Sequence, residues 1–164
     1  MTTRSSSCRR ASVAEKEAPD NVVELRARAL RLLARREHTR QELENKLSPH
    51  AGSSAELQGL ISGLKQKNQL SEERFAEGRA RQLARKYGAA RIRQDLKAKG
   101  VSAELILRFS SSEDELQRAK EILERKYRTL AATREEKAKR MRFLQSRGFS
   151  SEIIFKLLSS RGAD

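Results

Sequence analysis

The chain reads Tyr87-Gly88-Ala89-Ala90-Arg91-Ile92-Arg93-Gln94-Asp95-Leu96-Lys97-Ala98-Lys99-Gly100-Val101 in its middle, a basic segment bounded by two glycines. Glycine accepts the left-handed backbone that ends one helix and lets the chain enter the next. We therefore expect a short basic helix between Gly88 and Gly100. The segments around it have the same character, so we interpret it as one unit of a repeat.

The repeat is visible in the residues that follow the segment. Ser54, Ser102 and Ser150 stand about 48 residues apart, a spacing typical of helical repeats. The same spacing relates three further sets: Glu56, Glu104 and Glu152; Leu57, Leu105 and Ile153; Ile61, Phe109 and Leu157. A capping serine, an acidic first turn and two core positions thus recur three times. This recurrence predicts three related helical units.

The second and third copies agree more closely with each other than with the first. Each has a glycine at the end of its second helix, Gly100 or Gly148. Each also has a hydrophobic staple around the serine, from Val101 to Ile106 and from Phe149 to Ile154. The first copy lacks both features and has a loop extension over residues 49–53. Terminal repeats are often atypical.

Cap residues and apolar spacing predict where the helices begin. We expect starts at or near Asn21, Thr39, Ser54, Ser71, Gly88, Ser102, Ser112, Thr133 and Ser150. Capping boxes are predicted for Thr39 with Glu42, Ser112 with Glu115, and Thr133 with Glu136. The first helix has Val22, Leu25, Ala29, Leu32 and Leu33 on one stripe, and the aromatic residues, Phe155 included, are expected on core stripes or staples.

These patterns predict an all-α fold, an elongated tandem array of three three-helix, helix-turn-helix-like repeats. We expect the repeats to cover residues 21–70, 71–112 and 113–160, behind a disordered Ser-rich tail over residues 1–20. Aromatic residues make up only 4% of the chain and charged residues 35%, which argues against one thick core. We therefore expect several small apolar cores, each in a unit that packs against the next.

The charge balance points to an acidic partner. Lys and Arg number 36 against 22 Asp and Glu, giving a formal charge of +14. A polyanion or an acidic protein surface is the expected partner, although a basic surface can also serve solubility alone. Cys8 is the single cysteine, so neither an internal disulfide nor a thiol metal site is expected. We expect a cytoplasmic protein with neither a membrane span nor a signal peptide.

The residue types needed for catalysis are not combined in a recognisable way. His38 and His50 have no carboxylate cluster at ligand spacing, and we expect both at the surface or at helix ends. Gly59 and Gly63 near Lys65 do not form a phosphate loop, because a helix is predicted there. We therefore expect no metal, no cofactor and no enzymatic activity.

The basic side chains gather on the first two helices of each unit. A helix-turn-helix reader would place them on the third, but the helices after Ser102 and Ser150 are mostly apolar and offer chiefly Arg108 and Lys156. This distribution suits phosphate contact or an acidic protein groove better than base readout. The candidate contact residues are Arg79, Arg81, Arg85, Lys86, Arg91, Arg93, Lys97 and Lys99 in the second unit and Lys139, Arg140, Arg142 and Arg147 in the third.

Three motifs together resemble the RecX family of bacterial recombination regulators. They are Leu70-Ser71-Glu72-Glu73-Arg74-Phe75-Ala76-Glu77, then Tyr87-Gly88-x-x-Arg91-Ile92-Arg93-x-x-Leu96-x-x-Lys99-Gly100-Val101, and Arg142-Phe143-Leu144-x-Ser146-Arg147-Gly148-Phe149-Ser150. The resemblance implies tandem three-helix repeats. It also implies a protein that binds the RecA recombinase filament on single-stranded DNA and restrains strand exchange, ATP hydrolysis and coprotease activity.

Two interpretations of function therefore remain open. In the first, the chain is a monomeric regulator of a recombinase filament that touches single-stranded DNA directly or through the filament. In the second, it is a general basic nucleic-acid-binding helical protein. Salt dependence does not separate them, because both are electrostatic.

Overall fold

The described part of the chain is helical. The computed structural model describes residues 21–110, 114–127, 129 and 133–159. Its helices are α1 (Val22–Arg35), α2 (Arg40–Leu47), α3 (Ser54–Gln66), α4 (Glu72–Ala84), α5 (Ala89–Ala98), α6 (Ala103–Ser110), α7 (Glu115–Lys126), α8 (Arg134–Ser146) and α9 (Ser151–Ser159), with a 3-10 turn at Ser48–His50. The predicted tail over residues 1–20 lies outside the described residues.

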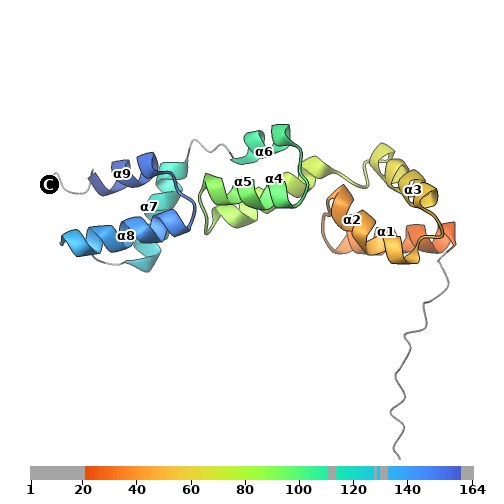
Figure 1. Ribbon diagram of the computed structural model, residues 1–164, viewed down its shortest axis with the longest axis horizontal. Helices are drawn as coiled ribbons and strands as arrows, with labels where there is room; N and C mark the ends of the chain where they lie inside the picture. Colours follow the sequence, from red (N-terminus) through yellow and green to blue (C-terminus); the bar gives the residue numbers. More distant parts are fainter. Residues whose placement is uncertain (1–20, 111–113, 128, 130–132, 160–164) are drawn as a thin grey trace, which may run out of the picture.

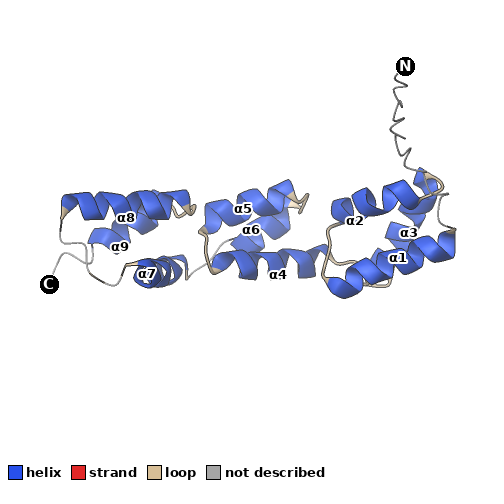
Figure 2. Ribbon diagram, turned by 90° about the horizontal axis from the view of Figure 1, so that it is seen from below, coloured by secondary structure: helices blue, strands red, loops and turns tan. Residues whose placement is uncertain are grey.

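The helices form three successive three-helix units, α1–α3, α4–α6 and α7–α9, arranged along one long axis (Figure 1). Figure 2 shows α2, α5 and α8 in one row and α1, α4 and α7 in another, while α3, α6 and α9 lie along one long edge in Figure 1. Each unit has a separate apolar cluster, which includes Leu43 in the first unit, Ile92 in the second and Leu144 in the third. The prediction of an elongated all-α array of three repeats is confirmed.

The first unit differs from its prediction in two details. Val22 is exposed, and the buried face of α1 consists of Leu25 and Ala29. The N-cap of α3 is Ser53 and not Ser54: its backbone is extended and its side chain accepts from the Glu56 amide at 3.1 Å. The first unit is therefore displaced by one residue relative to the predicted 48-residue register.

Two of the three predicted capping boxes lie within the described residues. Thr133 and Glu136 form a full capping box, as predicted. Thr39 accepts from the Glu42 amide at 3.1 Å, but the Glu42 carboxylate points away toward other partners, so the predicted box is only half formed. Ser112 lies outside the described residues, and α7 follows Asp114, which makes no capping bond.

The glycine turns agree with the sequence. Gly100 and Gly148 have φ of 73° and 81°, the left-handed conformation expected after a helix end. Val101 and Phe149 are buried beside them. One aromatic prediction is wrong: Phe155 is exposed, because the buried side of α9 is already filled by Ile154 and Leu157.

Candidate partner-binding surface

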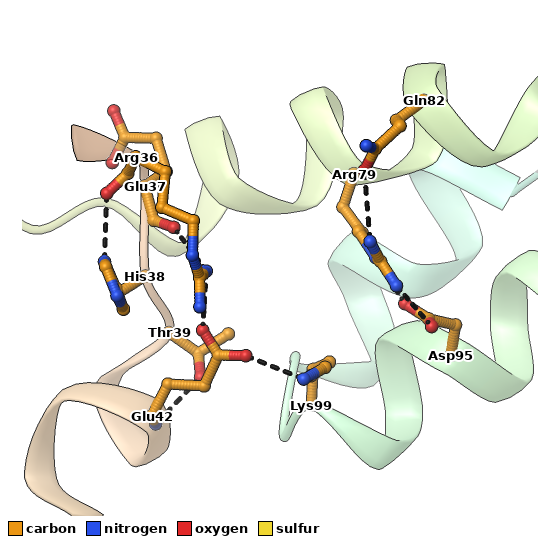
Figure 3. Close-up of polar contacts among 9 residues, drawn as sticks. All are labelled: Arg36, Glu37, His38, Thr39, Glu42, Arg79, Gln82, Asp95 and Lys99. Carbon is orange, nitrogen blue, oxygen red and sulfur yellow. Dashed lines mark hydrogen bonds and ion pairs between the residues drawn. The ribbon is translucent and has the colours of Figure 1, made fainter. Parts of the chain in front are cut away.

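Arg79, one of the predicted contact residues, is held inside the second unit. Its Nε and Nη2 each donate to the Asp95 carboxylate at 2.8 Å, which joins α4 to α5 (Figure 3). This paired hydrogen bonding lowers the pKa of Asp95, against the opposing effect of burial. Arg79 therefore acts first as a crosslink between two helices.

The Arg79–Asp95 pair makes the second unit sensitive to acid. A carboxylate whose pKa is lowered by folding adds stability above its unfolded pKa, near 3.8, and this stability is lost as the pH falls through the folded value. We expect Asp95→Asn to lower the stability at pH 7 by about 1 kcal/mol, a few degrees in Tm, and to flatten the fall in Tm below pH 4. Circular dichroism melts between pH 2.5 and 7 measure both effects.

Glu77→Gln is the matched control, because Glu77 pairs with Arg81 at the exposed surface, one helical turn apart on α4. Such a pair contributes little to stability. If the two variants had the same pH profile, the Asp95 pair would not be the source of the acid sensitivity.

Ion pairs join the first unit to the second (Figure 3). Lys99 Nζ at the end of α5 contacts Glu42 Oε1 at 2.8 Å, and Arg36 Nη1 contacts Glu42 Oε2 at 2.9 Å. Arg74 Nε on α4 contacts Glu37 at 2.7 Å. Burial alone would raise the pKa of Glu42, but the hydrogen bonds from Lys99 and Arg36 outweigh it and lower that pKa. Lys99 is therefore already neutralised by the first unit.

His38 lies at the same junction and is a structural residue. It is buried, with 1% of its surface exposed, and its Nδ1 lies 2.9 Å from the Arg36 carbonyl (Figure 3). Burial lowers its pKa and favours the neutral ring. His38 directly precedes Thr39, the N-cap of α2, so the expected helix-end position is right, whereas a surface position is wrong. No group of ligands that could hold a metal ion occurs among the residues that the structure describes.

Backbone contacts join the second unit to the third. The Gly88 amide donates to the Arg147 carbonyl at 2.9 Å, and the Ala90 amide donates to the Gly148 carbonyl at 3.2 Å. Glu115 of α7 accepts from the Ala89 amide at 2.8 Å and so satisfies an amide at the N-terminus of α5. This junction needs close approach of two main chains, which glycine at 88 and 148 permits.

A basic groove opens beside this second junction. We call it the junction groove; it is lined by Arg85, Lys86, Tyr87, Ile122, Arg125, Lys126, Phe143 and Arg147 and encloses about 400 Å³. Five of these eight residues are cationic, and the lining contains no carboxylate. In contrast, the groove at the first junction includes Glu37 and Glu42, which neutralise part of its charge.

Three of the five cations of the junction groove, Arg125, Lys126 and Arg147, are held in place by rings and carbonyls. The Arg147 guanidinium lies 5.4 Å from the centre of the Tyr87 ring and 5.1 Å from that of Phe143, and Lys126 Nζ lies 4.5 Å from the Phe143 ring. Arg125 donates to the Arg85 carbonyl at 3.0 Å, and Arg147 donates to that of Lys86 at 3.2 Å. Both carbonyls lie just after the C-terminus of α4, where cations are favourable. The positive charge is thus positioned before any partner arrives.

The twelve predicted contact residues separate into two groups. Four are committed to the fold: Arg79, Lys99, Arg147 and Arg140, which is only 4% exposed and donates to the Thr129 carbonyl at 2.7 Å. Burial of Arg140 removes it from the surface that a partner could contact. The other eight have exposed side chains: Arg81, Arg85, Lys86, Arg91, Arg93, Lys97, Lys139 and Arg142.

Sequence reasoning did not include Arg125 and Lys126, although both line the junction groove. They end α7, and their position beside Arg85 and Lys86 depends on how the third unit docks on the second. A basic pair at the end of a helix was the available signal, but it does not predict which neighbour the pair will face. The groove can bind phosphate groups or carboxylates, since cationic donors position both without identifying bases.

Comparisons with known proteins match residues in each of the three units. Family models for the first, second and third three-helix domains of RecX match residues 26–50, 71–107 and 113–158. The chain is 40% identical over 136 residues to "Regulatory protein RecX" of Leptothrix cholodnii, covering 82% of this chain and 87% of that protein. It is 41% identical over 138 residues to the protein of that name from Herbaspirillum seropedicae, covering 83% and 90%.

Solved structures show the same fold. The crystal structure of RecX from Lactobacillus salivarius is similar with a TM-score of 0.73 and 21% sequence identity, covering 85% of this chain and 96% of that one. A second structure, described as regulatory protein RecX, has a TM-score of 0.70 and the same identity, covering 73% of its own chain. Within the described residues, no helix is both long enough and apolar enough to cross a bilayer.

Proposed function

This chain belongs to the RecX family of regulatory proteins, and on that premise we propose that it regulates a RecA-type recombinase by binding the recombinase filament on single-stranded DNA. In this proposal, binding restrains strand exchange, ATP hydrolysis and coprotease activity of the filament. The protein acts as a monomer in the cytoplasm. The three units are taken as residues 21–70, 71–112 and 113–160.

The junction groove is the observation that supports this proposal most directly. It gathers five cations between two units without a lining carboxylate. A nucleoprotein filament offers two sources of negative charge, phosphates and acidic side chains, and a groove of preplaced cations suits either. Helices α5 and α8, which lie in the same row in Figure 2, carry further exposed cations.

The elongated shape adds a second argument. Three units in a row can contact successive subunits of a repeating partner, and each further contact is made at a high effective concentration once the first has formed. Modest individual contacts then combine into firm binding. A filament of identical subunits is the kind of partner for which a tandem array is suited.

Recombinase ATPase on single-stranded DNA tests the proposal. We expect inhibition at protein concentrations well below those that coat bare single-stranded DNA, because the filament is the preferred target. DNA coating is followed in parallel by fluorescence anisotropy of a labelled oligonucleotide at the same ionic strength. Inhibition that appears only when the DNA is saturated would favour the general nucleic-acid-binding alternative and reject the proposed function.

A further inference from the structure

Two exposed apolar side chains occupy the same position in successive units. Leu107 on α6 and Phe155 on α9 are 66% and 70% exposed, although both are large and apolar. Each stands five residues after the serine that precedes its helix, Ser102 or Ser150, and each is followed by a cation. The two local sequences match throughout: Glu104-Leu105-Ile106-Leu107-Arg108-Phe109 and Glu152-Ile153-Ile154-Phe155-Lys156-Leu157.

The fold does not require these two side chains to be apolar. Ile154 and Leu157 supply the buried face of α9, and Ile106 and Phe109 pack against the cluster of the second unit. Exposed apolar residues are normal when they are single and scattered, but here the same position is exposed in two repeats. The first unit has Gln58 at this position, and its side chain bonds internally with Arg40 and Glu44.

From this pairing we propose that Leu107 and Phe155 insert into equivalent apolar sockets on two neighbouring subunits of a protein polymer. This proposal rests on the proposed function. It identifies the protein surface of the filament, rather than its DNA, as the partner of the two side chains. A leucine cannot stack on a base as an aromatic ring does, whereas an apolar protein socket accepts both side chains. Two equivalent positions on adjacent units imply two copies of the same socket.

Charge complementarity gives the sockets a second property. The chain has a formal charge of +14. Arg108 and Lys156, which directly follow the two apolar residues, are paired within the chain with Glu73 and Glu152, each at 2.7 Å. The net positive charge of the chain therefore favours apolar sockets that lie on an acidic protein surface. Helices α6 and α9 lie along the same long edge of the array in Figure 1, so both residues are carried by the edge that would face the polymer.

The test measures the affinity of the full chain for recombinase filaments and for bare single-stranded DNA. We expect Leu107→Gln and Phe155→Gln each to weaken filament binding about tenfold, and the double variant to weaken it further, without a change on bare DNA. Glutamine is a good helix former, and both positions are exposed, so the melting temperature should be unchanged. Val23→Gln with Met141→Gln is the matched control, because both residues are exposed but not related by the repeat.

Exchanging the two residues separates a protein socket from base stacking. We expect Leu107→Phe with Phe155→Leu to bind the filament within about threefold of the original chain, because equivalent apolar sockets tolerate either side chain. The socket proposal would be overturned if the exchange or the glutamine double variant weakened binding to bare DNA as much as binding to filaments. It would also be overturned if the glutamine double variant bound filaments as tightly as the Val23→Gln, Met141→Gln control does. Failure of the unaltered chain to bind filaments would reject the proposed function as well.

Discussion

Replacing Gly148 with alanine is expected to loosen the third unit from the second by about 3 kcal/mol. Gly148 has φ of 81°, where an alanine costs about 1 kcal/mol or more. An added Cβ would lie 2.7 Å from the Arg91 amide nitrogen and 2.8 Å from the Arg91 Cβ, so the two main chains must separate. Separation weakens the bonds from Gly88 to Arg147 and from Ala90 to Gly148, each worth about 1 kcal/mol.

Gly100→Ala is the matched control for this prediction. Gly100 has nearly the same backbone conformation, with φ of 73°, but an added Cβ would meet the side-chain oxygen of Gln41 at 2.6 Å. A glutamine side chain can move, whereas the backbone of α5 cannot. Gly100→Ala therefore introduces the strain of an alanine at positive φ, but it leaves the junction between the second and third units intact.

Energy transfer between fluorophores on the second and third units distinguishes the two variants. We expect a fall in transfer efficiency and a lower, broader melting transition for Gly148→Ala, and only a lower Tm for Gly100→Ala. Equal melting curves and unchanged transfer in both variants would contradict the assignment of Gly148 to the junction.

A chain ending near Ser112 should likewise melt lower than the full chain, because the third unit supports the second.

Local chemistry was predictable from the sequence, and docking between units was not. The cap at Thr133, the turns at Gly100 and Gly148 and the three-unit repeat depend on neighbouring residues or on a fixed period, and the structure agrees with each. The close approach of Gly88 to Gly148 joins residues 60 positions apart in different repeats. No local pattern encodes such a contact, although the sequence around both glycines predicts that each lies at a helix boundary.

For the candidate partner-binding surface, too, the sequence predicts which residues are cationic but not which of them are accessible. Counting cations identified the second and third units as basic, but pairing decides which cations are accessible. Arg79 is engaged by Asp95 and Lys99 by Glu42, while Arg140 is buried. Glu42 illustrates the cause: its position three residues after Thr39 predicts a capping box, yet two cations from its surroundings compete for the carboxylate. When cations from other parts of the fold lie close to a capping carboxylate, their ion pairs replace its hydrogen bond to the N-cap backbone.

Reversing two charges in the junction groove is expected to have the largest effect on function. Arg85→Glu with Lys86→Glu changes the five groove cations from a total charge of +5 to +1. Both side chains are exposed, so the fold should be retained. Each lost charged contact costs about 1.5–3 kcal/mol, so we expect filament affinity to fall at least a hundredfold. Binding titrations at two salt concentrations measure this loss and should show a weaker salt dependence.

The same change of net charge on α1 shows whether location matters. Arg31→Glu with Arg35→Glu also replaces two exposed cations with two carboxylates, but on a helix of the first unit that does not line the junction groove. Long-range attraction is screened beyond about 10 Å at 0.1 M salt, so this control should lose less than tenfold. Equal losses in both variants would mean that total charge governs binding, and the groove would then have no special role. A loss confined to the groove variant would identify the junction of the second and third units as the contact, since the junction groove has no lining carboxylate whereas the groove at the first junction has two.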